Sequence, residues 1–178
     1  YYRKTKDLLN FVPVPAGTNL TNFLNTNIGD LTNKGVEVAI NTVPWRNGNN
    51  EWTLGFNVAL NENKITKLTA TDDPGYQGVL TGGINGGVGN TIQIHSVGYP
   101  SFSYFVFEQV YDAAGIPIEG LYVDRNGDGT VTPADMYRYK KASPDATFGF
   151  YTGLNVGHFD FSLGARAMVG NFIYNNNL

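Results

Sequence analysis

The residues of this chain best suited to chemistry are the oxygen-bearing side chains between positions 124 and 135. They read Asp-Arg-Asn-Gly-Asp-Gly-Thr-Val-Thr-Pro-Ala-Asp. Calcium takes roughly six to eight hard oxygen ligands, and a twelve-residue loop with oxygens at alternating positions and a Gly at its sixth wraps them around one point. The spacing therefore predicts a structural Ca²⁺ site with the ligands Asp124, Asn126, Asp128, Thr130, Thr132 and Asp135.

Two features leave this metal site open to another interpretation. The last ligand position holds Asp135 where Glu is usual, and the shorter side chain reaches less far, which bears on affinity rather than on location. A sequence rich in Asp, Asn and Gly also forms tight turns without any metal. A dockerin module resembles this loop but carries it twice, on helices, and only one copy occurs here.

The rest of the chain offers little for catalysis. Cysteine is absent, and the two histidines, His95 and His158, lie far in sequence from any Ser/Asp pair of a recognisable nucleophile. The glycine-rich stretch 82–89 has no Lys at phosphate-binding spacing and no helix after it, so it is interpreted as a surface loop. A net charge of -3 argues against nucleic-acid binding. We expect no enzyme.

The elements that must position the acidic loop are β-strands. Residues 51–61 alternate strictly, with Trp52, Leu54, Phe56, Val58 and Leu60 on one face and small or polar residues on the other. Aromatic residues make up 13% of the chain and charged residues only 15%, a composition that favours β-structure with many turns. Similar alternation predicts about seven strands, at 1–6, 35–41, 51–61, 91–97, 102–111, 148–156 and 159–167.

The connections between these strands alternate in length. Residues 7–34, 62–90 and 112–147 are long, whereas 43–50, 98–101 and 157–158 are short, so all long loops fall at one end of the strands. Outer-membrane β-barrels are built in this way, with short periplasmic turns and long outer loops. The alternative is a secreted, calcium-stiffened β-sandwich that binds glycans, whose apolar strand faces would form a dry core.

Several phrases, in order along the chain, carry a family resemblance. They are Tyr-Tyr-Arg-Lys-Thr-Lys-Asp-Leu-Leu at 1–9, Val-Pro-Val-Pro-Ala-Gly-Thr at 12–18, Asn-Ile-Gly-Asp-Leu-Thr-Asn-Lys-Gly-Val-Glu at 27–37, Asn-Glu-Asn-Lys-Ile-Thr-Lys-Leu at 61–68, Gly-Tyr-Pro-Ser-Phe at 98–102 and Pro-Ile-Glu-Gly-Leu-Tyr-Val-Asp-Arg-Asn-Gly-Asp-Gly at 117–129. Together they resemble the C-terminal barrel portion of the SusC/RagA-type TonB-dependent outer-membrane transporters, over residues 1–178.

This resemblance implies an all-β fold in which the antiparallel strands form part of a plugged transmembrane barrel of about 22 strands with long extracellular loops. It implies import of oligosaccharides or peptides across the bacterial outer membrane, with a SusD-like surface lipoprotein as a lid and energy supplied through TonB. The plug, the TonB-contacting segment and the other strands are expected outside this sequence. Candidate substrate contacts in the loops are Tyr76, Gln77, Tyr122 and Tyr137.

Overall fold

The computed structural model describes residues 1–13, 23–69, 75–84 and 90–176, and these form an almost entirely β structure in two parts. One part is a five-stranded antiparallel sheet, the long sheet, with the order β1-β2-β3-β10-β11. Its strands are β1 (Tyr2–Pro13), β2 (Phe23–Asn47), β3 (Asn50–Lys67), β10 (Ala146–Val156) and β11 (Phe159–Val169). The described residues contain no helix long and apolar enough to cross a membrane.

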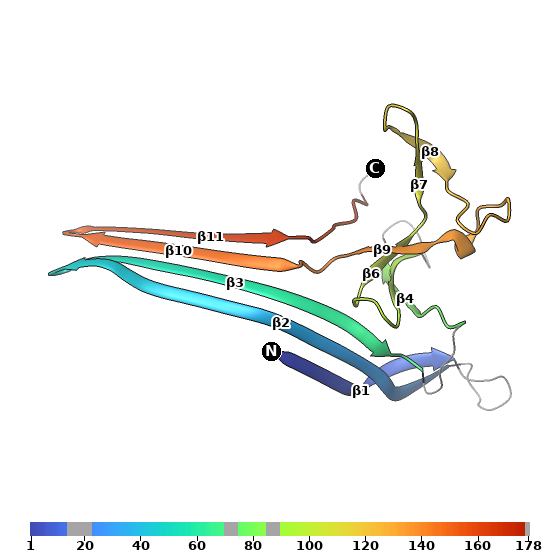
Figure 1. Cartoon of the computed structure of the whole chain (residues 1–178), viewed down its shortest axis with the longest axis horizontal. Helices are drawn as coiled ribbons and strands as arrows, with labels where there is room; N and C mark the ends of the chain where they lie inside the picture. The colour runs from blue at the N-terminus through green and yellow to red at the C-terminus, as the bar shows by residue number, and fades with distance from the viewer. Residues whose placement is uncertain (14–22, 70–74, 85–89, 177–178) are drawn as a thin grey trace.

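The second part is the long connection between β3 and β10, residues 68–145, which we call the loop module. It contains a four-stranded short sheet in the order β4-β5-β6-β9 and a separate two-stranded hairpin. The short sheet consists of β4 (Val79–Gly83), β5 (Thr91–His95), β6 (Ser103–Val106) and β9 (Tyr137–Lys141), the hairpin of β7 (Gln109–Tyr111) and β8 (Pro117–Tyr122), and the 3-10 turn η1 covers Pro133–Asp135. Figure 1 shows this module beyond one end of the long strands.

Strand register explains why the long sheet has one apolar face. Phe56 pairs with Ile40 on one side and with Phe150 on the other, and neighbouring pairs match Val58 with Val38 and Phe148. On β11, Phe161 pairs with Leu154 of β10. Because opposite residues point to the same side of a sheet, the apolar residues of four strands share a single face. The alternation predicted for 51–61, 148–156 and 159–167 is confirmed.

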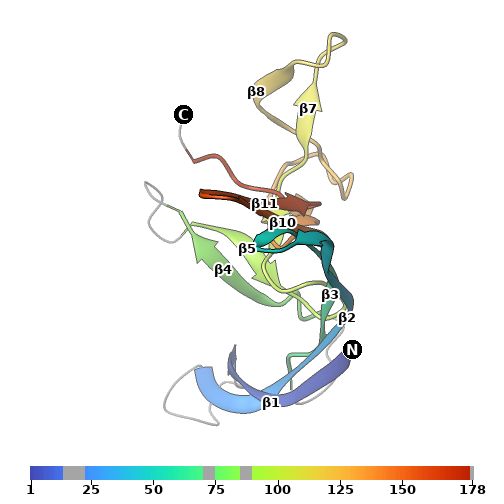
Figure 2. The same ribbon diagram turned by 90° about the vertical axis from the view of Figure 1, so that its left-hand side faces the viewer.

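Within the described ranges, no element packs over this apolar face. Phe161 is 59% exposed, Ile40 57% and Phe56 44%. The short sheet lies beyond the ends of the long strands instead of stacking over them (Figures 1 and 2). The β-sandwich alternative is therefore wrong, because it requires a second sheet packed on this face.

The opposite face of the long sheet carries small and polar residues that fit together closely. A Cβ atom added at Gly149 would lie 2.7 Å from the side-chain amide of Asn57, its cross-strand partner. At Gly153, an added Cβ would lie 2.8 Å from both Thr53 Oγ1 and Tyr151 Oη. Glycine is needed at these positions because the larger neighbours occupy the space above it.

The strand prediction needs two corrections. Residues 91–97 and 102–111 do not extend the long sheet: they contribute β5, β6 and β7 to the loop module. The described part of the long sheet therefore has five strands instead of the expected seven. Because the two predicted strands that lie outside the long sheet are consecutive, the later strands keep the directions that were predicted for them. The long connections therefore still fall at one end of the sheet.

The second correction concerns the expected connections, parts of which are strand. β2 continues through 43–47 and β3 through 62–67, and the expected loop 112–147 contains β8 and β9. Residues 7–34 were also expected to form a loop. β1 continues to Pro13 and β2 begins at Phe23, with a bulge where Asp7 takes a φ of 57°. Residues 14–22 of the expected loop lie outside the described residues. The opposite ends of the strands have tight turns as predicted, at Gly48 (φ 58°) and Gly157 (φ 61°), where positive φ favours glycine.

The buried hydrophobic residues described in the structure lie at the end of β3 and in the strands β5 and β6 of the short sheet. They are Ile65, Leu68, Ile94, Tyr104 and Phe105. The 98–101 turn joins the long sheet here, since Ile65 N donates to Tyr99 O (3.0 Å) and Gly98 N donates to Ile65 O (2.8 Å). The module is thus attached to the long sheet by hydrogen bonds as well as by the chain itself.

Candidate functional site in the loop module

Arg138 on β9 holds the loop module together. Its Nε donates to Ser96 Oγ (2.8 Å), and its NH2 group donates to the backbone carbonyl of Gln77 (2.6 Å). The guanidinium also lies 5.1 Å from the ring centre of Tyr99 and 5.4 Å from that of Phe105. Such a planar cation can make bidentate hydrogen bonds and stack on rings at once. Arg138 therefore ties the segment before β4 to β5 and β9.

A groove of about 890 Å³ crosses this module. Apolar side chains from β5, β6 and the segment after it form much of its wall, including Ile92, Ile94 and Phe105. Polar groups reach it at Gln77, Asn90, Thr91 and the two tyrosines Tyr122 and Tyr174. Pro133 and Met136, on either side of the buried Asp135, also line it, so the acidic loop supports one wall.

Two of the four predicted substrate contacts line this groove, Gln77 and Tyr122. Tyr122 packs its ring against Phe107, with 5.3 Å between the ring centres. Tyr76 and Tyr137 are not among the groove-lining residues. Tyr137 instead lies under the guanidinium of Arg125 at 4.3 Å, and burial raises its pKa, which suits a packing residue. Burial likewise raises the pKa of the half-buried Tyr76.

The acidic loop 124–135 is closed by bonds between its own side chains and backbone. Asp124 accepts from the N–H groups of Gly127 and Gly129, both at 2.7 Å. Asp135 is fully buried, and its carboxylate accepts from the N–H groups of Arg125, Asn126 and Thr132 at 2.9, 3.1 and 2.8 Å. These bonds pin the start of the loop to its end.

Hydrogen bonds also lower the pKa of two of these carboxyl groups. For Asp135 the main cause is the backbone N–H of Thr132, and for Asp128 it is the backbone N–H of Thr130. Both causes favour the charged form, because an N–H group donates to a carboxylate. The loop is therefore built around ionised side chains.

The six predicted calcium ligands supply hard oxygens, which is the chemistry that Ca²⁺ requires. Asn126, Asp128 and Thr130 lie on the exposed rim of the loop, and Asp124 and Thr132 are partly buried, whereas Asp135 is buried and faces the backbone amides. Among the described residues, no three His, Cys, Asp or Glu side chains converge as a metal-binding group. The donor set fits the ion in type, and the calcium site stays a prediction.

The histidines lie apart from this groove. Within the described residues, His95 Nε2 is the buried side-chain atom without a hydrogen-bond partner. Its ring meets Phe102 edge-on at 4.6 Å, and burial lowers its pKa, so the imidazole is neutral. A neutral ring packed on an aromatic is a structural residue.

Sequence reasoning did not single out a second hollow, of about 750 Å³, on the polar face of the long sheet. Its lining includes Asn41, Asn57, Tyr151 and Arg166 from four neighbouring strands. The alternation of polar and small residues on this face was the available signal, since cross-strand register brings these residues together.

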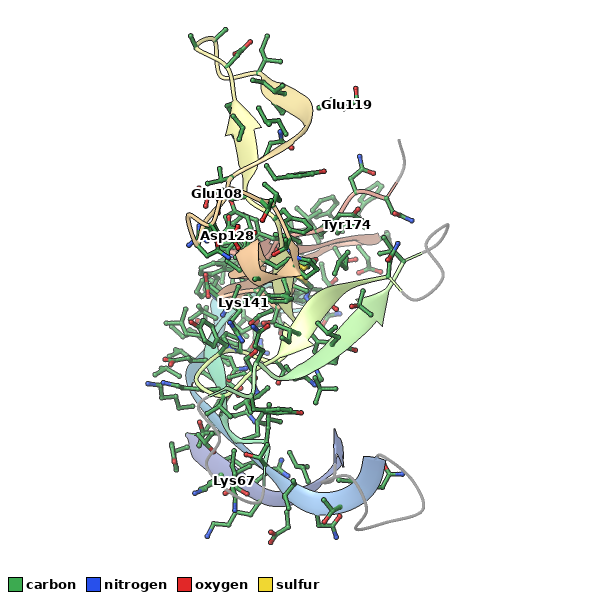
Figure 3. All side chains as sticks on the ribbon, turned by 90° about the vertical axis from the view of Figure 1, so that its right-hand side faces the viewer. Lys67, Glu108, Glu119, Asp128, Lys141 and Tyr174 are labelled. Carbon is green, nitrogen blue, oxygen red and sulfur yellow. The ribbon has the colours of Figure 1, made fainter. Side chains whose placement is uncertain are left out.

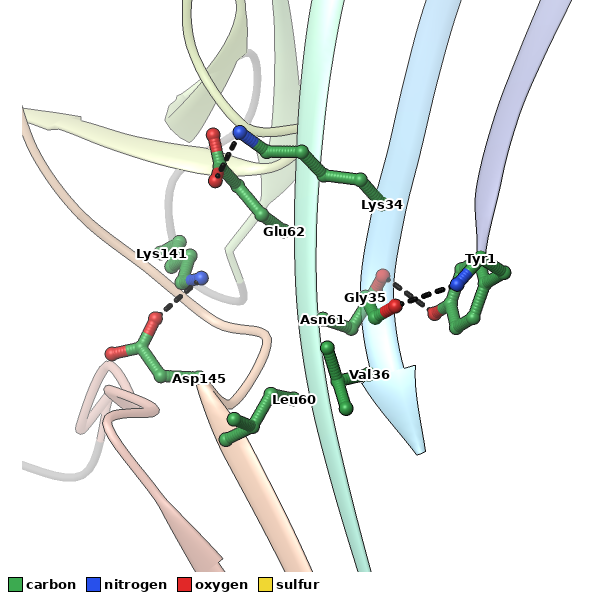
Figure 4. Close-up of a pocket in the computed structure, with 9 residues that line it drawn as sticks. All are labelled: Tyr1, Lys34, Gly35, Val36, Leu60, Asn61, Glu62, Lys141 and Asp145. Atoms are coloured by element: carbon green, nitrogen blue, oxygen red, sulfur yellow. Dashed lines mark hydrogen bonds and ion pairs between the residues drawn. The ribbon is translucent and has the colours of Figure 1, made fainter. Parts of the chain in front are cut away.

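A third pocket, of about 600 Å³, lies where the apolar residues of the long sheet end (Figure 4). Val36 and Leu60 line it together with two ion pairs, Lys34–Glu62 at 3.0 Å and Lys141–Asp145 at 2.6 Å. The apolar face therefore ends within two residues on each strand, between Val36 and Lys34 on β2 and between Leu60 and Glu62 on β3.

Comparisons with known proteins place these features in context. No protein-family model matches the chain. The TonB-dependent receptor SusC of Bacteroides thetaiotaomicron is 43% identical over 174 residues, which cover 98% of this chain and 17% of that receptor. A TonB-dependent receptor of Formosa agariphila is 34% identical over 188 residues, covering 98% of this chain and 18% of the relative.

Solved structures show the same fold. The RagAB peptide transporter matches 98% of this chain and 19% of the compared chain, with a TM-score of 0.71 and 24% identity. The RagAB peptide importer in its open-open state matches 96% and 18%, with a TM-score of 0.70 and 20% identity. The chain therefore spans less than a fifth of the length of these relatives, all of which are named receptors, transporters or importers. On these grounds the chain belongs to the SusC/RagA-type TonB-dependent receptors of the bacterial outer membrane.

Proposed function

We propose that this chain forms part of the wall and the outer loops of a TonB-dependent importer, within the C-terminal part of a barrel of about 22 strands. The observation that supports this most strongly is the continuous, uncovered apolar face of the long sheet. In water such a face would cause aggregation, whereas in a bilayer it matches the lipid tails.

The size of the apolar face supports a membrane-spanning role. From Trp52 to Leu60, β3 extends by roughly 26 Å at ~3.3 Å per residue, or roughly 20 Å along the membrane normal for a strand tilted by ~40°. Trp45 and Trp52 form a cross-strand pair at the end with the tight turns, as expected for an interfacial aromatic belt. Lys34 and Glu62 bound the face at its other end.

Orientation follows from the same proposal. The tight turns at Gly48 and Gly157 would face the periplasm, and the loop module would lie outside the cell, where long loops occur in such barrels. Oligosaccharides or peptides would be imported, with a SusD-like lipoprotein as the outer lid and TonB as the energy source. The groove with Gln77 and Tyr122, and the polar-face residues Tyr151 and Arg166, are the candidate substrate contacts.

The test is to isolate the full-length parent receptor from outer membranes in detergent and identify co-purifying proteins by mass spectrometry. We expect a stoichiometric SusD-like lipoprotein. Deletion of the receptor gene should abolish growth on one oligosaccharide or peptide source and leave growth on glucose unchanged. A parent receptor found in the soluble fraction, without any lipoprotein, would overturn the proposal.

We also propose that the acidic loop binds Ca²⁺ as a structural ion. Support comes from the match of six oxygen-bearing positions and from the ionised state of Asp128 and Asp135. Extracellular calcium modules bind with Kd values of about 10⁻⁴ to 10⁻³ M. In the wild-type full-length receptor, added calcium should slow hydrogen exchange of the backbone amides in residues 123–136. The variant Asp124→Asn should shift the midpoint to higher concentration, and an equal response to Mg²⁺ alone would contradict a calcium site.

A further inference from the structure

The part of the loop module that projects farthest has an unusual charge. Residues 108–135, which we call the acidic arm, comprise the β7–β8 hairpin and the acidic loop. Figures 1 and 2 show the hairpin projecting away from both sheets. The arm contains six carboxylates and one guanidinium, Arg125, so its formal charge is -5 against -3 for the whole chain. The remainder of the chain is therefore slightly basic.

The acidic arm also exposes apolar side chains. Ile116 is 61% exposed, Tyr111 59% and Leu121 47%, and every residue of β8 is exposed. Among the described residues, the hairpin has no third strand beside it. Figure 3 shows Glu119 beside β8 and Glu108 and Asp128 nearer the base of the hairpin, so carboxylates lie among and below the exposed apolar residues.

Hydrogen bonds within the β7–β8 hairpin fix its conformation. Gln109 Nε2 lies within hydrogen-bond distance of the carbonyls of Val110, Ile118 and Leu121, at 2.9, 2.6 and 3.1 Å, so three acceptors share its two hydrogens. At the tip, Asp112 accepts from the N–H groups of Ala114 and Ile116 at 2.9 and 2.8 Å. An arm that is already ordered loses little conformational entropy on binding.

The base of the arm is fixed to the short sheet. Arg125 forms an ion pair with Glu108 and stacks over Tyr137 of β9. The N–H of Val123 donates to Glu108 O at 2.9 Å, which joins the two ends of the hairpin. The hairpin is therefore carried on a rigid base, and its exposed side chains keep a fixed spacing.

We infer that the acidic arm is a docking surface for a protein partner that presents apolar side chains surrounded by lysine and arginine. The choice of occupant rests on charge complementarity, since the formal charge of the arm is -5, or -3 with the proposed Ca²⁺ bound, and either value favours a basic surface and repels anionic lipid. Under the proposed function, on which this step rests, the partner is the surface lipoprotein that caps the receptor. Isoleucine and leucine are the groups expected to enter its apolar pockets.

The experiment uses the full-length receptor in detergent and the lipoprotein that co-purifies with the wild type, prepared separately, with calcium held constant. Binding is measured at low and high salt. Glu119→Lys tests the charge, and the double substitution Ile116→Asn, Ile118→Asn tests the apolar contact. Matched controls outside the arm are Glu62→Lys on β3 and Val97→Asn near β5, both exposed in the free chain.

We expect Glu119→Lys to weaken binding about tenfold at low salt and much less at high salt, because rim charges act mainly on the association rate. The isoleucine pair should weaken binding tenfold or more at both salt concentrations. Both controls should bind like the wild type.

Wild-type affinity of both arm variants, with the lipoprotein still bound, would overturn the inference and leave the proposed function intact. A wild-type receptor that binds no lipoprotein would instead overturn the proposed function. A changed oligomeric state of the receptor, with unchanged lipoprotein affinity, would assign the arm to contact with a second copy and would also reject the inference.

Discussion

The long sheet and the loop module place their apolar side chains in opposite ways. In the long sheet they point outward on one continuous face, and its large residues such as Phe56 and Phe150 stay exposed. In the loop module a small set including Ile94 and Phe105 is buried, with Arg138 bound at its edge. The difference shows which solvent each part is built for, lipid in one case and water in the other.

The strongest challenge to this comparison is a charge in the middle of the apolar face. We expect Phe56→Arg to destabilise the full-length receptor in lipid vesicles by about 2–4 kcal/mol, because a cation near the bilayer centre loses its hydration. Asn57→Arg, one residue along on the polar face, is the control and should cost less than about 1 kcal/mol. Urea unfolding measures both. An equal loss of stability in the two variants would contradict the assignment of one face to lipid and of the other to water.

The corresponding change in the loop module is Arg138→Met. It removes hydrogen bonds to Ser96 Oγ and Gln77 O and the stacking on Tyr99 and Phe105, which together contribute roughly 2–3 kcal/mol. We expect faster hydrogen exchange in 75–78 and 96–99, with β10 and β11 unchanged. Lys140→Met is the control, since Lys140 lies over exposed rings of Tyr139 and Phe172. Faster exchange throughout the long sheet would show that the two parts are not independent.

The acidic loop should respond to substitution and to pH. Asp135→Asn places an amide where Thr132 N–H now donates, so exchange of the 123–136 peptide should rise by roughly tenfold.

The pKa of Asp135 is lowered in the folded chain, so its carboxylate stabilises the loop above the ordinary pKa of 3.8, and this contribution is lost as pH falls below that value. Exchange of the wild-type peptide, corrected for the intrinsic pH effect, should therefore be constant from pH 7 to 5 and rise only below 3.8. A rise near neutral pH would contradict this assignment.

The smallest expected effect is at the boundary between the two parts. Lys34 and Glu62 are each more than half exposed, and such surface pairs contribute about 0–0.5 kcal/mol. A double-mutant cycle of Lys34→Met and Glu62→Gln should therefore give a coupling energy within that range. A coupling above about 1 kcal/mol would mean that the rim is far less hydrated than its exposure indicates.

Sequence patterns predicted the membrane part of the fold better than the water-exposed part. In 51–61, 148–156 and 159–167 the period of two was strict, because one face must be apolar throughout. Residues 23–34 look like a loop, with many Asn and Thr residues, yet they are strand in β2. A strand that continues beyond the bilayer needs no apolar face, so its pattern disappears while its hydrogen bonds remain.

The groove of the loop module was harder to predict from the sequence than the acidic loop. The groove joins Gln77, Tyr122 and Met136 from segments far apart in the sequence, and only strand pairing in the short sheet and in the β7–β8 hairpin brings them together. The acidic loop was recognisable because all its interacting residues lie within twelve positions. What the sequence does not reveal is that Asp135 turns toward three backbone amides.

One feature of the connectivity bears on how such receptors diversify. The loop module leaves the long sheet at β3 and returns at β10, and these two strands are hydrogen-bonded neighbours. The sheet itself therefore fixes the distance between the two attachment points, whatever the insertion contains. Closing a longer loop costs only about 0.6 kcal/mol for each doubling of its length. One receptor could thus inherit the loop module of another by recombination at these strands while its long sheet stays the same.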